Sequence, residues 1–299
     1  MIPALLTSLR PHQWSKNLLV FAALGFSKHL LDLVPLLHAC VAFLVFCGLS
    51  GAVYLVNDVV DLERDKRHPL KRQRPVASGA LSARGALLAA ALIALVSLGV
   101  ALWLAGPFAL CSGVYLGMNL LYSLRLKQVV IVEVLTLSLG FPLRAVAGSL
   151  AIAAPISDWL IVCTLLLALF LALAKRRHEL TSLSTSAAEH RSSLSEYSPY
   201  LLDQMIGVVT ASCVMAYCFY TLAPETTEKF QTTRLSWTIP FVLYGIFRYL
   251  YLVHQKEQGG NPSELLLTDR PLLVAVGVWA AATVLILYTA PGAPIPLSR

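Results

Sequence analysis

Charged side chains are scarce in this chain of 299 residues, and their scarcity excludes several classes of protein. Asp, Glu, Lys and Arg together make up 13% of the residues, whereas hydrophobic residues make up 57%. A soluble domain usually carries about 25% charged residues. The composition therefore excludes an ordinary soluble enzyme and a disordered chain, and it indicates a membrane protein.

Paired cysteines are lacking as well. The chain has six cysteines, no two of which form a CxxC pair, and they lie within apolar segments. This pattern predicts neither a disulfide framework nor a zinc site. The first apolar segment leads directly into further ones without a small-residue cleavage site, so we expect no removable signal peptide.

Nine apolar stretches are each long enough to cross a bilayer as a helix. They predict an all-α membrane protein, a nine-transmembrane-helix bundle that forms one integral membrane domain over residues 1–299. The predicted spans cover about residues 17–37, 39–58, 84–104, 107–123, 129–151, 157–175, 205–223, 235–254 and 272–290.

The loops that join these spans differ in charge. Loops on one side carry 17 Lys and Arg residues, and loops on the other side carry 4. The positive-inside rule therefore places the N-terminus and the charged loops in the cytoplasm and the C-terminus outside. Because the formal net charge of +7 lies in membrane loops, anionic lipid or phosphate is a better partner than nucleic acid.

An acidic cluster ends the second predicted span. Asn57, Asp58, Asp61 and Asp65 would share an arc of about 100° if one straight helix carried them all. Carboxylates packed this closely repel one another and raise one another's pKa. A hard divalent cation relieves that repulsion, and Mg²⁺ takes oxygen ligands from carboxylates, water and phosphate. These four residues are therefore predicted to bind Mg²⁺.

A basic run follows the acidic cluster. Lys66, Arg67, Lys71, Arg72 and Arg74 lie within residues 66–74. A cytoplasmic loop needs positive charge for its topology alone, but cations beside an acidic cluster also suit a bound polyanion. The combination predicts a diphosphate group held between the metal and these side chains.

Together these motifs resemble the UbiA superfamily of intramembrane prenyltransferases. The resemblance rests first on the Asn-Asp-x-x-Asp-x-x-x-Asp pattern from Asn57 to Asp65 at the end of a second span, and it covers essentially the whole chain. Three further segments are similar to the decaprenyl-phosphate phosphoribosyltransferase branch of that superfamily. They are Arg10 to Asn17, His68-Pro69 to Arg74-Pro75, and Tyr122-Ser123-x-x-x-x-Lys127.

The resemblance implies a Mg²⁺-dependent transferase in the cytoplasmic (inner) membrane of a bacterium. Such an enzyme joins 5-phosphoribosyl 1-diphosphate to a polyprenyl phosphate and releases diphosphate. It also implies that Asp58, Asp61 and Lys16 are catalytic. The residues expected to contact substrate are Lys16, Tyr54, Lys66, Arg67, Arg74, Tyr122, Lys127, Arg144, Lys175 and Arg176.

One segment departs from the wider superfamily. Aromatic prenyltransferases of this superfamily typically carry a second aspartate-rich motif after the sixth span, where this chain has Lys175-Arg176-Arg177-His178-Glu179. Three cations in place of carboxylates favour binding of a further anion over a second metal. Two phosphorylated substrates would supply such an anion, and an aromatic acceptor would not.

Four of the candidate residues also have a purely structural interpretation. Lys16 would snorkel from the membrane interface, and Lys127 would add topogenic charge to a short turn. Arg144 is an intramembrane charge, which typically marks function, but pairing with backbone carbonyls or with Glu133 would also explain it. Arg176 would form an exposed helix-end ion pair of little energetic value.

Two other functions compete with phosphoribosyl transfer. One is an aromatic or quinone-precursor prenyltransferase of the same superfamily, which two metal sites would favour. The other is a lipid or small-molecule transporter, which would be expected to contain paired broken helices. The segment Gly140-Phe141-Pro142 is the only clear interruption within a span and has no obvious counterpart. The sequence leaves homo-oligomerisation open.

Overall fold

The computed structural model describes residues 2–155, 157–182, 192–260, 262–290 and 297, and these residues form helices and loops without a strand. Eight of the helical segments are long and apolar enough to cross a membrane. They are α3 (Leu33–Val60), α5 (Ala83–Leu104), α6 (Gly106–Leu124), α7 (Val132–Ala151), α8 (Asp158–Ser182), α10 (Pro199–Leu222), η5 (Arg234–Thr238) continuing as α12 (Ile239–Gln255), and α14 (Arg270–Thr289). The all-α membrane prediction is therefore confirmed, whereas the count of nine spans is not.

The first predicted span, residues 17–37, is not one long helix. The 3₁₀ helix η1 (Pro11–Phe21) leads into α2 (Ala22–Phe26), and α3 already begins at Leu33. Between them the chain turns through Lys28, whose φ is 63°. Pro35 lies in the first turn of α3, where proline is tolerated. The apolar stretch from Leu30 to Leu37 concealed this turn, because it reads as a continuation of one span although most of it belongs to α3.

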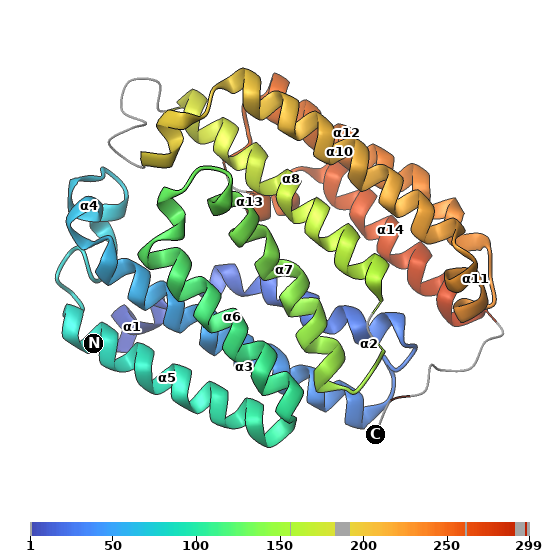
Figure 1. The fold of residues 1–299 in the computed structure, drawn as a ribbon, viewed down its shortest axis with the longest axis horizontal. Coiled ribbons are helices and arrows are strands. Elements are labelled where there is room, and N and C mark those ends of the chain that lie inside the picture. Colours follow the sequence, from blue (N-terminus) through green and yellow to red (C-terminus); the bar gives the residue numbers. More distant parts are fainter. Residues whose placement is uncertain (1, 156, 183–191, 261, 291–296, 298–299) are drawn as a thin grey trace.

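Short helices cap the two ends of the bundle. They are α1 (Ile2–Ser8), α4 (Leu62–Arg67), η2 (Lys71–Gln73), η3 (Leu126–Gln128), η4 (Ser192–Glu196), α11 (Pro224–Phe230) and α13 (Pro262–Thr268). Figure 1 shows α4 and the start of α5 at one end, and α2 and α11 at the other. We call the first of these the charged end, because residues 61–84, 125–127 and 175–177 lie there and carry most of the Lys and Arg residues.

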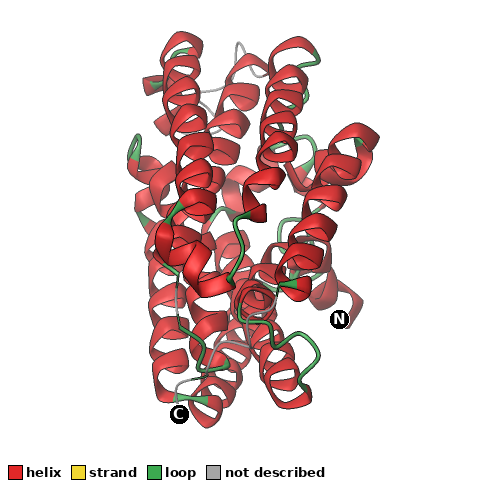
Figure 2. Cartoon of the chain, turned by 90° about the vertical axis from the view of Figure 1, so that its right-hand side faces the viewer, coloured by secondary structure: helices red, strands yellow, loops and turns green. Residues whose placement is uncertain are grey.

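The long helices run side by side, as the turned view in Figure 2 shows, and the two largest hydrophobic clusters of the described residues pack between them. One core joins α8, α10, α12 and α14 around Phe170, Leu202 and Tyr249. The other joins α3, α5 and α6 around Phe46 and Phe108. Because α7 supplies residues to both, it lies between the two halves of the bundle.

The 3₁₀ helix η1 packs directly on the backbone of α7. A Cβ atom added to Gly148 would lie 2.0 Å from the carbonyl oxygen of Val20. Only glycine permits so close an approach. This contact fixes the height of η1, and with it Lys16 and Asn17, against the helix that carries Arg144.

Candidate active site

A cavity of about 1770 Å³ lies between the two halves of the bundle. Its lining at the charged end is polar and includes Lys16, Asn57 and Asp61, whereas aromatic side chains such as Trp159 and Tyr220 line it toward the other end. A site for one small ligand usually measures about 300–1,000 Å³. The cavity therefore has room for a polar substrate and a long apolar one together.

Asn57 and Asp61 face this cavity from the end of α3. The ammonium group of Lys127, in η3, donates to both, at 3.3 Å from Asn57 Oδ1 and 2.6 Å from Asp61 Oδ1. Two side-chain oxygens thus converge on one positive charge. Oxygens of this kind are the ligands that Mg²⁺ prefers.

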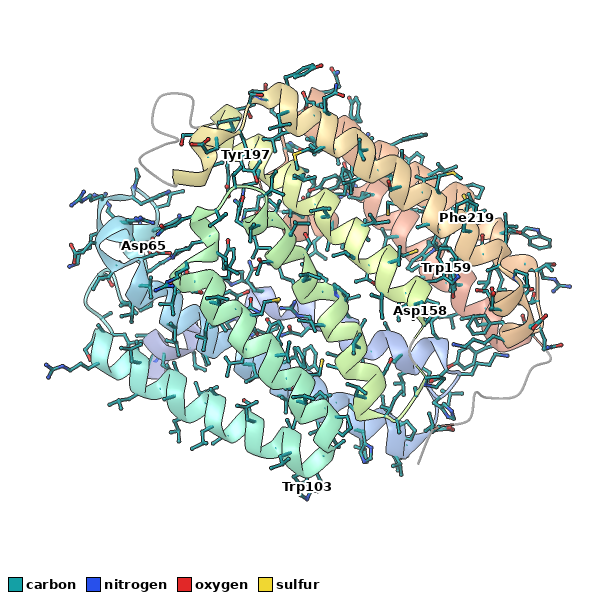
Figure 3. The ribbon with its side chains drawn as sticks, in the orientation of Figure 1. Asp65, Trp103, Asp158, Trp159, Tyr197 and Phe219 are labelled. Carbon is teal, nitrogen blue, oxygen red and sulfur yellow. The ribbon has the colours of Figure 1, made fainter. Side chains whose placement is uncertain are left out.

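Asp58 and Asp65 form a second pair, which is buried. Arg74 bridges them, with Nη1 3.2 Å from Asp58 Oδ1 and 2.6 Å from Asp65 Oδ2. Arg10 donates a further short hydrogen bond to Asp58, and its guanidinium lies 4.8 Å from the centre of the Tyr54 ring. Figure 3 places Asp65 on α4, at the charged end. These contacts tie the N-terminal segment to the basic run after α4.

The four predicted metal-binding residues therefore form two pairs instead of one cluster. The predicted arc required one straight helix through Asp65, but α3 ends at Val60 and Asp61 leaves helical geometry with φ −92° and ψ 7°. Among the described residues, no three Asp, Glu, His or Cys side chains are grouped closely enough to hold a metal ion. Asn57 and Asp61 remain the pair that faces the cavity.

Lys16 lines the cavity from η1. It forms neither a hydrogen bond nor an ion pair with any described residue. Burial, together with the nearby positive charges of Lys175, Arg144 and Arg10, lowers the pKa of its ammonium group to about 7. An ammonium group in such surroundings is stabilised by an anion.

Arg144 lies on α7 and lines the same cavity, with 6% of its surface exposed. Its guanidinium donates to Asn17 Oδ1 at 2.8 Å, to the carbonyl of Gly140 at 2.6 Å and to the hydroxyl of Tyr115 at 2.7 Å. The alternative of pairing with backbone carbonyls is thus borne out in part, and pairing with Glu133 is wrong. The helix α7 continues unbroken through Pro142.

Glu133 instead holds Arg176 in a buried, two-pronged ion pair. Arg176 Nε and Nη2 lie 2.6 Å and 2.7 Å from the two carboxylate oxygens of Glu133, which is fully buried. Arg176 also donates to Glu179 and lines the cavity. The expected exposed helix-end pair is therefore wrong for Arg176, whereas the neighbouring Lys175 has an exposed side chain at the cavity.

The remaining candidates differ in their position. Tyr54 and Tyr122 line the cavity. Lys66 and Arg67 are exposed and are not among the described residues that line it, and Lys66 pairs with Glu63 at 2.7 Å. The structure thus separates these two cations from the rest of the predicted site.

Sequence reasoning missed Arg10, Asn17 and Tyr115 as site residues. Arg10 and Asn17 belong to the N-terminal motif that carried the resemblance, so the motif contained the signal. Tyr115 lies in an ordinary apolar helix, and nothing in its neighbourhood along the chain marks it. Only the fold brings it to Arg144.

Comparison with known proteins agrees with this architecture. Residues 18–268 match the UbiA prenyltransferase family. A decaprenyl-phosphate phosphoribosyltransferase of Corynebacterium glutamicum is 34% identical over 294 residues, which cover 96% of this chain and 87% of that protein. One of Mycolicibacterium smegmatis is 32% identical over 292 residues, covering 93% and 91%.

A solved structure of similar fold is that of a UbiA homologue from Archaeoglobus fulgidus bound to GPP and Mg²⁺. It matches with a TM-score of 0.72 at 19% identity, over 96% of this chain and 100% of that chain. The family match spans most of the sequence, and the fold agrees with it. The chain therefore belongs to the UbiA prenyltransferase family.

Proposed function

We propose that this protein transfers a 5-phosphoribosyl group from 5-phosphoribosyl 1-diphosphate to a polyprenyl phosphate and releases diphosphate. One observation carries the proposal: a single cavity presents the oxygens of Asn57 and Asp61 together with cations, Lys16 and Arg144, that have no carboxylate partner. Two substrates with separate phosphate groups suit such a cavity. The names of the relatives from Corynebacterium glutamicum and Mycolicibacterium smegmatis support the same reaction.

The diphosphate of the donor would bind at the charged end. Asn57 and Asp61 already direct oxygens at one cation, Lys127, so their geometry fits a bound Mg²⁺ ion. When bound, Mg²⁺ would neutralise the diphosphate oxygens and favour departure of the diphosphate. Asp58 and Asp65 would keep Arg74 in place at the cavity wall.

The reaction itself exchanges one C–O bond for another at C1 of the ribose. The acceptor phosphate oxygen forms a bond to C1 while the bond from C1 to the diphosphate oxygen breaks, and the configuration at C1 inverts. Negative charge grows on the leaving diphosphate, where Arg74 at the cavity wall would stabilise it more strongly in the transition state than in the bound substrate. The acceptor is already anionic near pH 7, so no strong general base is required.

The polyprenyl chain would occupy the apolar part of the cavity. That part extends along α8 and α14 past Leu167, Val276 and Trp279. Hydrocarbon can therefore stay among apolar side chains while its phosphate reaches the polar end. This arrangement agrees with an active site at the cytoplasmic face of the bacterial inner membrane, where the charged loops would lie.

The decisive experiment uses the purified full chain with Mg²⁺, 5-phosphoribosyl 1-diphosphate and a polyprenyl phosphate, and detects the lipid-linked phosphoribose by mass spectrometry. We expect product from the natural chain and none from Asp61→Asn. Arg84→Gln is the matched control, because Arg84 is exposed at the same end and lies outside the described cavity lining. Product formed only from a prenyl diphosphate and an aromatic acid would overturn the proposal.

A further inference from the structure

Arg144 uses only three of its guanidinium N–H groups in hydrogen bonds with described residues. A guanidinium carries five N–H groups, and three of them are used by Asn17, Gly140 and Tyr115. One N–H on each terminal nitrogen has no acceptor among the described residues. Terminal guanidinium N–H groups are donors with which arginine binds phosphate oxygens.

The surroundings of Arg144 fix its position without neutralising it. All three of its acceptors are uncharged. Asn17, the first of them, is itself held by Ser50 Oγ and Cys47 Sγ, each 3.3 Å from its amide nitrogen. A buried cation without a counter-ion is costly inside a membrane protein and usually marks a functional position. The guanidinium of Arg144 is therefore fixed in a position where it could bind an anion.

Lys16 supplies a second unneutralised cation in the same place. It has no hydrogen-bond or ion-pair partner among the described residues and lines the same cavity, and the positive charges of Lys175 and then Arg144 act on it. Two like charges in a low-dielectric site repel each other unless an anion lies between them. One anion bound between Lys16 and Arg144 would therefore stabilise both cations.

Within this one cavity, Arg144 lies at a different depth from the proposed diphosphate position. Ser50, which holds Asn17, lies about 10 Å further along α3 than Asn57, at about 1.5 Å per residue. Arg144 lies about 18 Å from the start of α7 at the charged end. One diphosphate held at Asn57 and Asp61 would leave the deeper cations without an anion.

We propose that Lys16 and Arg144 bind a phosphate monoester dianion, at a subsite deeper in the cavity than Asn57 and Asp61. The proposal rests on the proposed function, which supplies two such groups: the 5-phosphate of the donor and the phosphate of the polyprenyl acceptor. Either source has the same chemistry. A prenyl diphosphate and an aromatic acid would bring no monoester to this subsite.

The test measures binding, not turnover, with two probes: ribose 5-phosphate and farnesyl phosphate. Removing a charged hydrogen-bond donor typically lowers affinity by about 10- to 100-fold. We expect Lys16→Met and Arg144→Gln each to weaken one probe by about that factor and to leave Mg²⁺-dependent binding of inorganic diphosphate unchanged. Loss of ribose 5-phosphate binding would assign the subsite to the donor, and loss of farnesyl phosphate binding would assign it to the acceptor.

Matched controls keep the result clear. Lys256→Met and Arg84→Gln remove exposed cations outside the described cavity lining and should bind both probes normally. Lys16 makes no hydrogen bond or ion pair, so Lys16→Met should fold even if Arg144→Gln does not. Unchanged binding of both probes to Lys16→Met, or no binding of either probe to the natural chain, overturns the subsite. Failure of the proposed function would appear separately, as absence of the lipid product while a probe still binds.

Discussion

Gly148 of α7 lies against the backbone of Val20 in η1, so closely that a Cβ atom on Gly148 would lie 2.0 Å from the Val20 carbonyl oxygen. Backbone cannot yield as a flexible side chain can. The contact therefore fixes η1, which bears Lys16 and Asn17, at the level of Arg144 on α7. The absence of a side chain at Gly148 thus determines the geometry of the deep part of the cavity.

Gly148→Ala should consequently displace η1 and disturb the cavity. We expect a loss of about 1–3 kcal/mol in stability, as is typical of overpacking, together with loss of phosphoribosyl transfer. Gly117→Ala in α6 is the matched control, because nothing lies within 4 Å of a Cβ atom there. Thermal unfolding in detergent and the mass assay would measure both effects. Equal behaviour of the two variants would contradict the structural role of Gly148.

The sequence predicts much of this site because its residues lie close together along the chain. The motif from Asn57 to Asp65 and the basic run that ends at Arg74 need only a helix end and a loop to meet. What the sequence did not reveal is that Asn57 and Asp61 share Lys127 whereas Asp58 and Asp65 share Arg74, because those partners come from segments outside α3.

Contacts between distant segments were the least predictable. Arg144 meets Asn17 and Tyr115, and Glu133 meets Arg176, only after α7 has packed on η1, α6 and α8. No local sequence pattern indicates which of several polar residues inside apolar helices will contact each other. The first predicted span failed for a different reason, because the apolar segments on both sides of the turn from Ser27 to Asp32 read as one continuous span.

The buried pair of Glu133 and Arg176 should serve stability. Glu133→Gln would leave a buried guanidinium with Glu179 as its remaining carboxylate partner. Breaking a buried ion pair on one side typically costs about 3–5 kcal/mol. We expect a clear fall in the unfolding temperature, and partial recovery in the double variant Glu133→Leu with Arg176→Met, since apolar replacement of both partners is tolerated. A double variant less stable than Glu133→Gln would contradict this view.

Lys127 should compete with the metal. Its ammonium group lies 2.6 Å from Asp61 Oδ1 and 3.3 Å from Asn57 Oδ1, so a divalent ion bound by those oxygens must displace it. Lys127→Met should therefore raise Mg²⁺ affinity in the absence of donor by about fivefold, the equivalent of about 1 kcal/mol. Calorimetric titration would measure this affinity, with Lys256→Met as the control. Unchanged Mg²⁺ affinity in Lys127→Met would show that the lysine does not occupy the metal position.

Lys16 should make substrate binding depend on pH. Burial and the positive charges of Lys175, Arg144 and Arg10 lower its pKa to about 7 in the absence of substrate, so the side chain loses its charge as the pH rises above that value. A phosphate bound beside it favours the charged form and raises the pKa again. Affinity should accordingly fall between about pH 7 and 9, while the substrate phosphate itself, with a second pKa of about 6, stays fully ionised. Lys16→Arg keeps its charge across this range because arginine does not deprotonate in proteins, and its KM for the phosphorylated substrate should therefore stay level. The same pH profile in both proteins would exclude Lys16 as the titrating group.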